Sequence, residues 1–180
     1  MDCTAPLARG GFSAACPVTV VGSGNWLLSC DRVGPQVLAA IRERYGPEVE
    51  LGVVGSHGLA VLDYLHHQDL LIVVDACVGM GIPGEVMLLE PDLDSPPGRE
   101  TSVHQIGPVE ALLVGRHLYP EKMPRRALLL LIETEGLDPP GEAESCRKAV
   151  DLLDHEINAW RRGSSVPPTG ERARDCAAGR

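Results

Sequence analysis

Apolar runs and segments of helical periodicity alternate along most of this chain. Apolar runs predict buried strands at residues 17–21, 70–74 and 127–132, and residues 48–54 and 84–89 are further candidate strands. Apolar residues along one helical face predict helices at residues 33–45, 59–66, 103–115 and 142–160. Because strands alternate with helices, we predict a single α/β domain in which a mostly parallel, twisted sheet of about five strands carries helices on both faces.

The two ends of the chain lack this pattern. Residues 1–16 show no periodicity, so we expect a loose N-terminal arm. Residues 163–180 mix Gly, Ser, Pro and Arg, a composition that favours disorder. The α/β domain is therefore expected to cover residues 17–162.

No stretch predicts a membrane span or a secretory signal. The longest apolar run, residues 127–132, is far shorter than the roughly 20 residues that cross a bilayer. The N-terminus has no basic segment followed by an apolar core, as a secretory signal would have. We therefore expect no membrane partner.

Charge and cysteine usage narrow the possible functions. The chain has 25 acidic and 16 basic residues and a formal net charge of −9, which argues against a nucleic-acid-binding protein because such binding rests on cations. Six cysteines are scattered without a CxxC spacing, which favours reduced thiols over disulfides or a zinc site. We therefore expect a cytoplasmic protein with no nucleic-acid partner.

Three side chains lie where such a fold places its chemistry. Asp31 follows a glycine-rich turn, and with Ser29 as the N-cap it lies in the first turn of the next helix, where the dipole favours a carboxylate. Asp75 ends the buried run LLIVV, at the carboxyl edge of the sheet. His104 falls in a first helical turn if Ser102 is the N-cap, which favours a neutral imidazole.

Each of the three residues also has a structural explanation. Asp31 would only complement the dipole, Asp75 would bond turn amides, and His104 would be a polar residue at a helix end. In open α/β sheets, however, ligands bind beyond the carboxyl ends of the strands. Two carboxylates and one imidazole there leave coordination positions open, which suits a divalent metal that must also meet a substrate.

Four motifs in this order resemble those of the hydrogenase maturation endopeptidases. That family has G-x-G-N followed by an acid and a glycine, then a G-[ST]-x-G turn. A strand ending in Asp-Ala follows, with a Pro-Gly pair soon after it, and the last motif is a His-Gln/Glu-x-Gly helix start. In this chain the motifs stand at residues 22–25 with Asp31 and Gly34, then at 55–58, 75–76 with 83–84, and 104–107. The similarity runs from about residue 18 to residue 160.

The resemblance implies an activity and a set of site residues. The activity is one cut that removes the C-terminal extension from the precursor of a nickel-iron hydrogenase large subunit, after nickel has been inserted. Asp31, Asp75 and His104 fall on the residues that bind metal and serve catalysis. Nickel would come with the substrate, and zinc or cadmium are expected to act as surrogates. The glycine-rich turn would then aim Asp31 across a cleft and would not cradle a phosphate.

This chain departs from the family pattern at three positions. Cys30 and Val53 stand where acids are common, and Pro108 replaces the usual Leu, a change expected to shift the start of its helix. An alternative function is therefore a non-catalytic nickel-checking or chaperone module that docks the hydrogenase large subunit. A nucleotide-binding domain would need a third glycine in register and an acid at the end of the second strand, and the chain has neither.

Other cysteines and histidines are weaker candidates. Cys30 and Cys77 each lie beside a site aspartate, but small buried residues explain them better than thiol nucleophiles do. His57 is expected to line the cleft. His66 and His67 end a short helix and are expected to be solvated.

Overall fold

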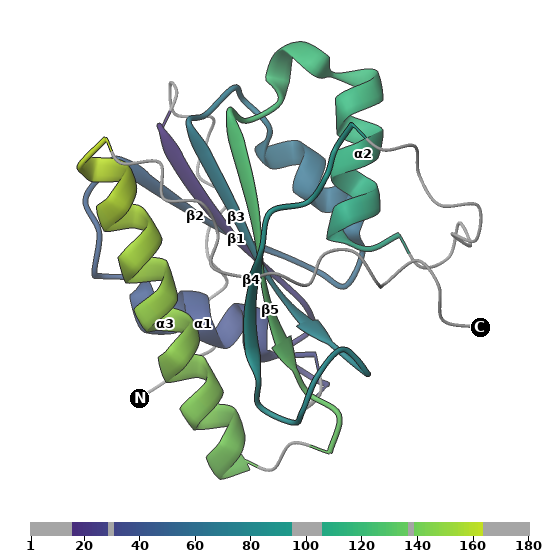
Figure 1. Ribbon diagram of the computed structural model, residues 1–180, viewed down its shortest axis with the longest axis vertical. Helices are drawn as coiled ribbons and strands as arrows, with labels where there is room; N and C mark the ends of the chain where they lie inside the picture. Colours follow the sequence, from purple (N-terminus) through teal and green to yellow (C-terminus); the bar gives the residue numbers. More distant parts are fainter. Residues whose placement is uncertain (1–15, 29–30, 95–105, 137–138, 164–180) are drawn as a thin grey trace.

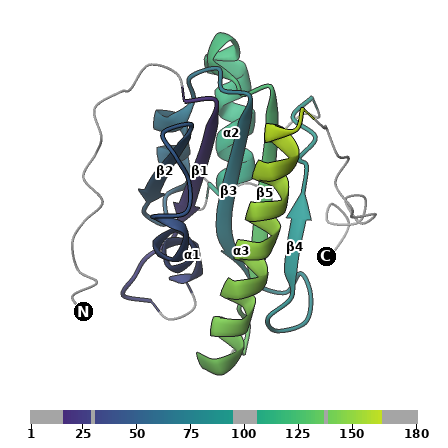
Figure 2. The same ribbon diagram turned by 90° about the vertical axis from the view of Figure 1, so that its left-hand side faces the viewer.

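The computed structural model describes residues 16–28, 31–94, 106–136 and 139–163. These residues form one five-stranded sheet with helices on both faces (Figure 1; Figure 2). The strands are β1 Val18–Ser23, β2 Val49–Val54, β3 Leu70–Cys77, β4 Val86–Leu89 and β5 Arg126–Glu133. The helices are α1 Val33–Ile41, α2 Pro108–Leu118 and α3 Pro139–Arg161, with the 3-10 turns η1 Gly58–Tyr64 and η2 Pro120–Lys122.

The sheet is mostly parallel, as predicted, with strand order β2-β1-β3-β5-β4. β1 pairs in parallel with β2 and with β3, and β3 pairs in parallel with β5. β4 runs antiparallel to β5 at the edge, where Val86 faces Ile132. The connection from β3 to β4, residues 78–85, has no crossover helix and reverses the chain direction. Because β5 lies between β3 and β4, this connection passes the carboxyl end of β5.

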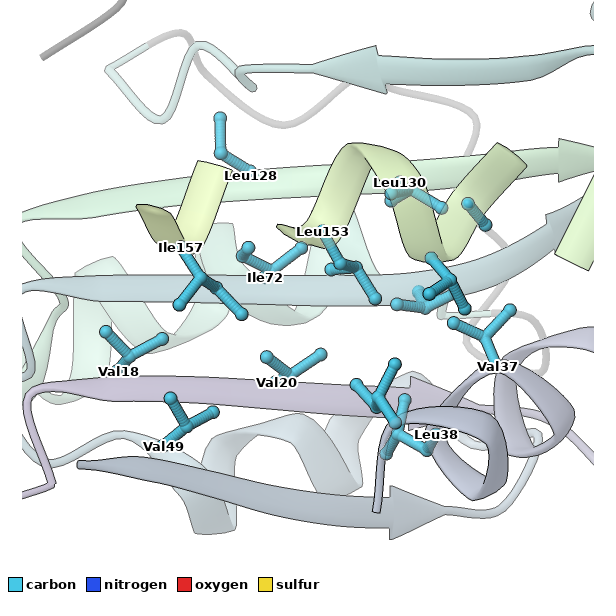
Figure 3. Packing of buried hydrophobic residues seen from close by; sticks show 14 of the residues in the cluster. Val18, Val20, Val37, Leu38, Val49, Ile72, Leu128, Leu130, Leu153 and Ile157 are labelled. Atoms are coloured by element: carbon cyan, nitrogen blue, oxygen red, sulfur yellow. The ribbon is translucent and has the colours of Figure 1, made fainter. Parts of the chain in front are cut away.

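Helices cover both faces of the sheet, as predicted. Helices α1 and α3 cover one face, where Val20 and Ile72 pack with Leu153 of α3 (Figure 3). The other face carries η1 and α2, and there Val21 and Val73 lie in a second apolar cluster. Residues adjacent in a strand thus enter opposite cores, which explains why the buried strands read as continuous apolar runs.

Several boundaries differ from the prediction. Helix α1 stops at Ile41, and β3 continues to Cys77 because it stays paired with β5 as far as Glu133. The predicted short helix is the 3-10 turn η1. The arm at 1–15 and the tail at 164–180 lie outside the described residues, so the limits of the domain stay a prediction. Within the described parts of the chain, none of the helices has the length and apolar character needed to cross a bilayer.

His66 was predicted to be solvated, but the structure shows it bonded and half-buried. Its Nε2 atom lies 3.1 Å from Glu50 Oε2 and 3.1 Å from Thr19 Oγ1, and the ring is half-buried. The chain reverses at His67, whose φ is 65°, so only this second imidazole is exposed. The cause is the 3-10 geometry of η1, which ends at Tyr64 and returns the following residues to the sheet.

Helix α1 starts in direct contact with the ends of two strands. A Cβ atom on Gly34 would lie 2.2 Å from the carbonyl oxygen of Ser23 and 2.7 Å from that of Val74. A Cβ atom on Gly22 would in turn lie 2.7 Å from the carbonyl oxygen of Gly34. Because these neighbours are backbone atoms, they cannot move aside as a side chain can. The two glycines therefore fix how closely α1 lies on β1 and β3.

Gly34→Ala is expected to destabilise the protein by at least about 2 kcal/mol, because the new methyl group overpacks a rigid contact. Gly55→Ala is the matched control, since a Cβ atom there meets nothing within 4 Å and the residue has no positive φ. Urea denaturation of both variants would measure the difference. Equal free energies of unfolding would contradict the close packing described for Gly34.

Candidate active site at the carboxyl end of the sheet

Two aspartates come together where the strand order reverses. The chain moves from β1 outward to β2, then returns to the other side of β1 to form β3. Asp31 follows β1, and Asp75 lies near the end of β3. In open α/β folds this switch point is the usual ligand site. The two carboxylates are near enough that the charge on Asp31 contributes to the pKa of Asp75.

Asp75 is a largely desolvated carboxylate. It lies within β3 and not directly after it as expected, because strand pairing continues to Cys77. Burial raises its pKa from 3.8 to about 6, and the negative charge of Asp31 adds to the rise. The Ser23 hydroxyl and the Ala76 amide donate hydrogen bonds to the carboxylate and limit the rise. The site therefore disfavours a second negative charge and favours a cation.

Asp31 is held by a tight loop and by a serine from the next strand connection. A Cβ atom on Gly24, whose φ is +133°, would lie 2.0 Å from the Asp31 carbonyl oxygen. The Asn25 amide donates to that same oxygen at 2.8 Å. The Ser56 hydroxyl donates to Asp31 Oδ2 at 2.6 Å. The glycine-rich turn thus shapes the backbone around Asp31.

The predicted position of Asp31 in the first turn of a helix is wrong. Helix α1 begins at Val33 with Arg32 as its N-cap, and no acid lies in its first turn. Ser29, the expected N-cap, lies outside the described residues. The helix does start at Val33, where its apolar spacing placed it. The N-cap differs because the backbone of Asp31 is bonded into the preceding loop, where its amide donates to the Leu28 carbonyl at 3.0 Å.

Ser56 belongs to the G-S-H-G turn, which also contacts the chain that leads into α2. The Gly58 amide donates to the Ile106 carbonyl at 3.1 Å. A Cβ atom on Gly58 would lie 2.4 Å from the same oxygen, so glycine is needed for this approach. His57 in this turn is exposed. The turn therefore links Asp31, through Ser56, to the segment that follows His104 in the sequence.

His104 itself lies outside the described residues, so its role as a third ligand stays a prediction. The expected first-turn position is wrong, because α2 begins at Pro108 with Gly107 as its N-cap. Proline is favoured at the first helical position, where its missing N–H is not needed. Among the described residues, no three His, Cys, Asp or Glu side chains form a group that would hold a metal ion.

Neither site aspartate has a cationic partner in the described part of the chain. The ion pairs there join other residues, and none includes Asp31 or Asp75. Arg32, the neighbour of Asp31, is bound through two hydrogen bonds of 2.7 and 2.8 Å to the buried Glu142 of α3. A hollow of about 550 Å³ between α1 and α3 is lined by this pair, and neither aspartate lines it. The cationic side chain nearest in sequence is thus engaged elsewhere.

Glu133, at the end of β5, is a buried acid that the sequence analysis missed. Burial alone would raise its pKa, but the amides of Glu135, Met80, Gly81 and Gly79 donate to its carboxylate and hold the pKa below its usual value. The bond from the Met80 amide is 2.7 Å long. Glu133 could have been identified by the same pattern that identified Asp75. Both are acids that directly follow a buried apolar run, which is LLLLI before Glu133.

Cys77, the cysteine described at this edge, is poorly suited to act as a nucleophile. Burial raises the pKa of the Cys77 thiol to about 12, with further rises from Glu133, Asp75 and Glu85. The thiol is therefore protonated at neutral pH, whereas a reactive cysteine needs a lowered pKa. Cys30, the other candidate, lies outside the described residues.

The comparisons with known proteins agree with this picture. A model of the hydrogenase maturation protease family matches residues 35–159, more than half of the chain. The chain is 30% identical over 127 residues to the hydrogenase 2 maturation protease of Escherichia coli strain K12, covering 68% of this chain and 76% of that protein. It is 27% identical over 166 residues to the hydrogenase expression/formation protein HoxM of Cupriavidus necator, covering 87% of this chain and 81% of that protein.

Solved structures share the fold. The hydrogenase maturating endopeptidase HybD from Escherichia coli aligns with a TM-score of 0.63 and 25% identity, over 81% of this chain and 93% of that one. The maturation protease HycI from Thermococcus kodakarensis KOD1 aligns with a TM-score of 0.57 over 82% of this chain and 96% of that one. Its 20% identity supports the fold alone.

The family match starts at residue 35, so it does not itself include Asp31, and the roles of the site residues are not decided by it. It does decide the class of the protein. The matching family and its two relatives from Escherichia coli are proteases, which does not favour a non-catalytic docking module. We conclude that this chain belongs to the hydrogenase maturation protease family and is a peptidase.

Proposed function

We propose that this chain removes a C-terminal extension from the precursor of a nickel-iron hydrogenase large subunit, in the cytoplasm, after nickel has been inserted. The observation that carries the proposal is the convergence of Asp31 and Asp75 at the switch point of the sheet in a member of this protease family. The name of the relative from Escherichia coli agrees, since that protein is a hydrogenase 2 maturation protease.

Asp31, Asp75 and His104 would grip the nickel that the substrate carries. Carboxylate oxygens and an imidazole nitrogen are suitable donors for such an ion. The described part of the site fits this role, because Asp75 is desolvated beside another acid, and neither carboxylate is paired with a described cation. An ion between the two carboxylates would offset the burial, and the smaller repulsion from Asp31, that raise the pKa of Asp75.

The residues of this chain would orient and restrain the bound precursor. Ser56 fixes the carboxylate of Asp31, and Ser23 fixes that of Asp75, so neither has to reorganise when the substrate arrives. Nickel in the substrate would supply a Lewis acid that polarises a water or the scissile carbonyl. A precursor without nickel would lack the anchor, so cleavage would depend on prior loading.

The test is to incubate the protein with nickel-loaded and nickel-free precursor and to detect the released tail by mass spectrometry. The tail is expected only with the loaded precursor. A loaded precursor that binds but stays intact would contradict the proposal and support a docking module. Equal cleavage of both precursors would contradict the role of nickel as the anchor.

Asp75→Asn is expected to lower the cleavage rate at least about 100-fold, because it removes a charge from the site but keeps the shape of the side chain. The new side chain still accepts the hydrogen bond from Ser23. Circular dichroism would check that the fold is kept. A wild-type rate of processing by Asp75→Asn would contradict the assignment of Asp75 to the site.

The same substitution is expected to stabilise the fold at neutral pH. A carboxyl group whose pKa rises from 3.8 to about 6 on folding favours the folded state below pH 4 and loses that contribution as the pH rises through 6. Asp75→Asn has no such loss. Its free energy of unfolding at pH 8 should therefore be roughly 1 to 3 kcal/mol larger than that of the wild type. Near pH 4 the two proteins should differ little. Thermal unfolding at both pH values would measure this, and a gain that does not depend on pH would contradict it.

His104→Ala is expected to weaken the binding of zinc or cadmium, used as surrogates, at least about tenfold. An imidazole with a reference pKa of about 6.5 must lose its proton to bind, so wild-type affinity should fall in mild acid, and the variant should show a flatter profile. Calorimetric titration between mildly acidic and neutral pH would measure both effects.

His155→Ala is the control, because His155 is exposed on α3. His66 is less suitable as a control, because its ring is bonded to its neighbours. If His104→Ala binds metal like the wild type, with the same pH profile, His104 is not a ligand. His57, in the turn that holds Asp31, would then be the next residue to test.

A further inference from the structure

Exposed apolar side chains gather at the end of the sheet that carries the two aspartates. Nine large apolar side chains are exposed among the described residues, and seven of them lie in or directly after the loops that follow β1, β2 and β3. We call these seven the apolar rim: Trp26, Leu27, Leu28, Leu59, Val78, Met80 and Ile82. The other two, Leu118 and Tyr119, lie where α2 ends. In Figure 1 α2 ends near the top of the view, and β5 points to the lower end.

The exposure within the rim is large. Leu27 is 90% exposed, Ile82 71% and Val78 64%. The loops after β1 and β3 add no charge to this apolar surface. Their sequences, GNWLL at 24–28 and ACVGMGIPG at 76–84, contain no charged residue. Single exposed apolar residues are ordinary, whereas a group around one site marks an interaction surface.

The loop that carries Val78, Met80 and Ile82 is held in place by buried groups. Its Met80 and Gly81 amides donate to the carboxylate of Glu133, at 2.7 and 3.2 Å, and that side chain is fully buried. Burying a carboxylate is costly unless such donors surround it. The loop therefore presents its apolar side chains from a fixed backbone.

The loop that carries Trp26, Leu27 and Leu28 is also bonded to the site. The Leu28 amide donates to the Asn25 carbonyl at 3.1 Å, and the Asp31 amide donates to the Leu28 carbonyl at 3.0 Å. Asn25 Oδ1 accepts from the Leu27 amide at 2.9 Å. This half of the rim thus belongs to backbone that also positions Asp31, and the other half begins three residues after Asp75 in the sequence.

We propose that the apolar rim docks the folded body of the hydrogenase large-subunit precursor, while the tail of that precursor reaches Asp31 and Asp75. This inference rests on the proposed function. It names that precursor as the occupant because the rim is continuous with the site at which the precursor is cut. The matching face of the partner is apolar and is bordered by Lys or Arg, because the exposed Glu85 and Glu135 lie beside the rim and the chain carries a net charge of −9.

The docking surface is tested by Leu27→Asp and Ile82→Asp, one substitution in each half of the rim. Each variant is expected to raise the KM for nickel-loaded precursor at least about tenfold, and the double variant more, because a charge is placed in an apolar contact. Leu118→Asp is the matched control, since Leu118 is 61% exposed but lies at the other end of the sheet. Its KM is expected to stay within about twofold of the wild type.

The possible outcomes separate the two proposals. If the wild type releases no tail from loaded precursor, the proposed function fails. If the wild type cleaves and both rim variants, with unchanged melting temperatures, keep the wild-type KM, only the docking surface fails. Sedimentation analysis of the chain alone tests a second copy as the occupant. A dimer that Ile82→Asp dissociates, with no change in KM, would overturn the docking of the precursor.

Discussion

Close contact between backbone segments at the carboxyl ends of β1 and β3 is the constraint on which the site depends. Gly34 lets the start of α1 lie against the ends of both strands, and Gly24 lets the following loop close on the backbone of Asp31. Gly58 lets the chain that enters α2 approach the turn that holds Asp31. In all three places a Cβ atom would meet a backbone oxygen at 2.4 Å or less. The motif glycines therefore serve packing around a carboxylate, and a phosphate is not needed to explain them.

Two acids at the ends of neighbouring strands show how differently the same charge can be accommodated. Glu133 ends β5 and receives several backbone amides, so its pKa is lowered although the side chain is fully buried. Asp75 lies near the end of β3 with one amide, one hydroxyl and a second acid nearby, so its pKa is raised to about 6. Glu133 is thus satisfied by the protein itself and fixes a loop. Asp75 lacks such compensation, which is typical of residues kept for function at a cost in stability.

Much of the fold could be predicted from the sequence, because strands buried on both faces leave continuous apolar runs such as LLIVV. The antiparallel direction of β4 could not, since it depends on a short connection that carries no periodicity. The N-cap of α1 and the start of α2 were misplaced, because loop hydrogen bonds and a proline decide them and apolar spacing does not. Ser56 and Ser23 were not identified as partners of the aspartates, because contacts between residues 25 and 52 positions apart leave no local signal.

The two loops of the rim connect recognition to chemistry under the proposed function. Leu28 precedes Asp31 by three residues, and Val78 follows Asp75 by three. Contacts made at the rim would therefore act on the same short backbone segments that hold the carboxylates. Both loops are already fixed by internal hydrogen bonds, so docking would order little of this chain, and more of the contact free energy would remain for aligning the scissile bond. An apolar rim without charge gives little directional information, whereas nickel held by two carboxylates would define a single point. The rim would supply affinity for the precursor, and the aspartates would supply the condition that it be loaded.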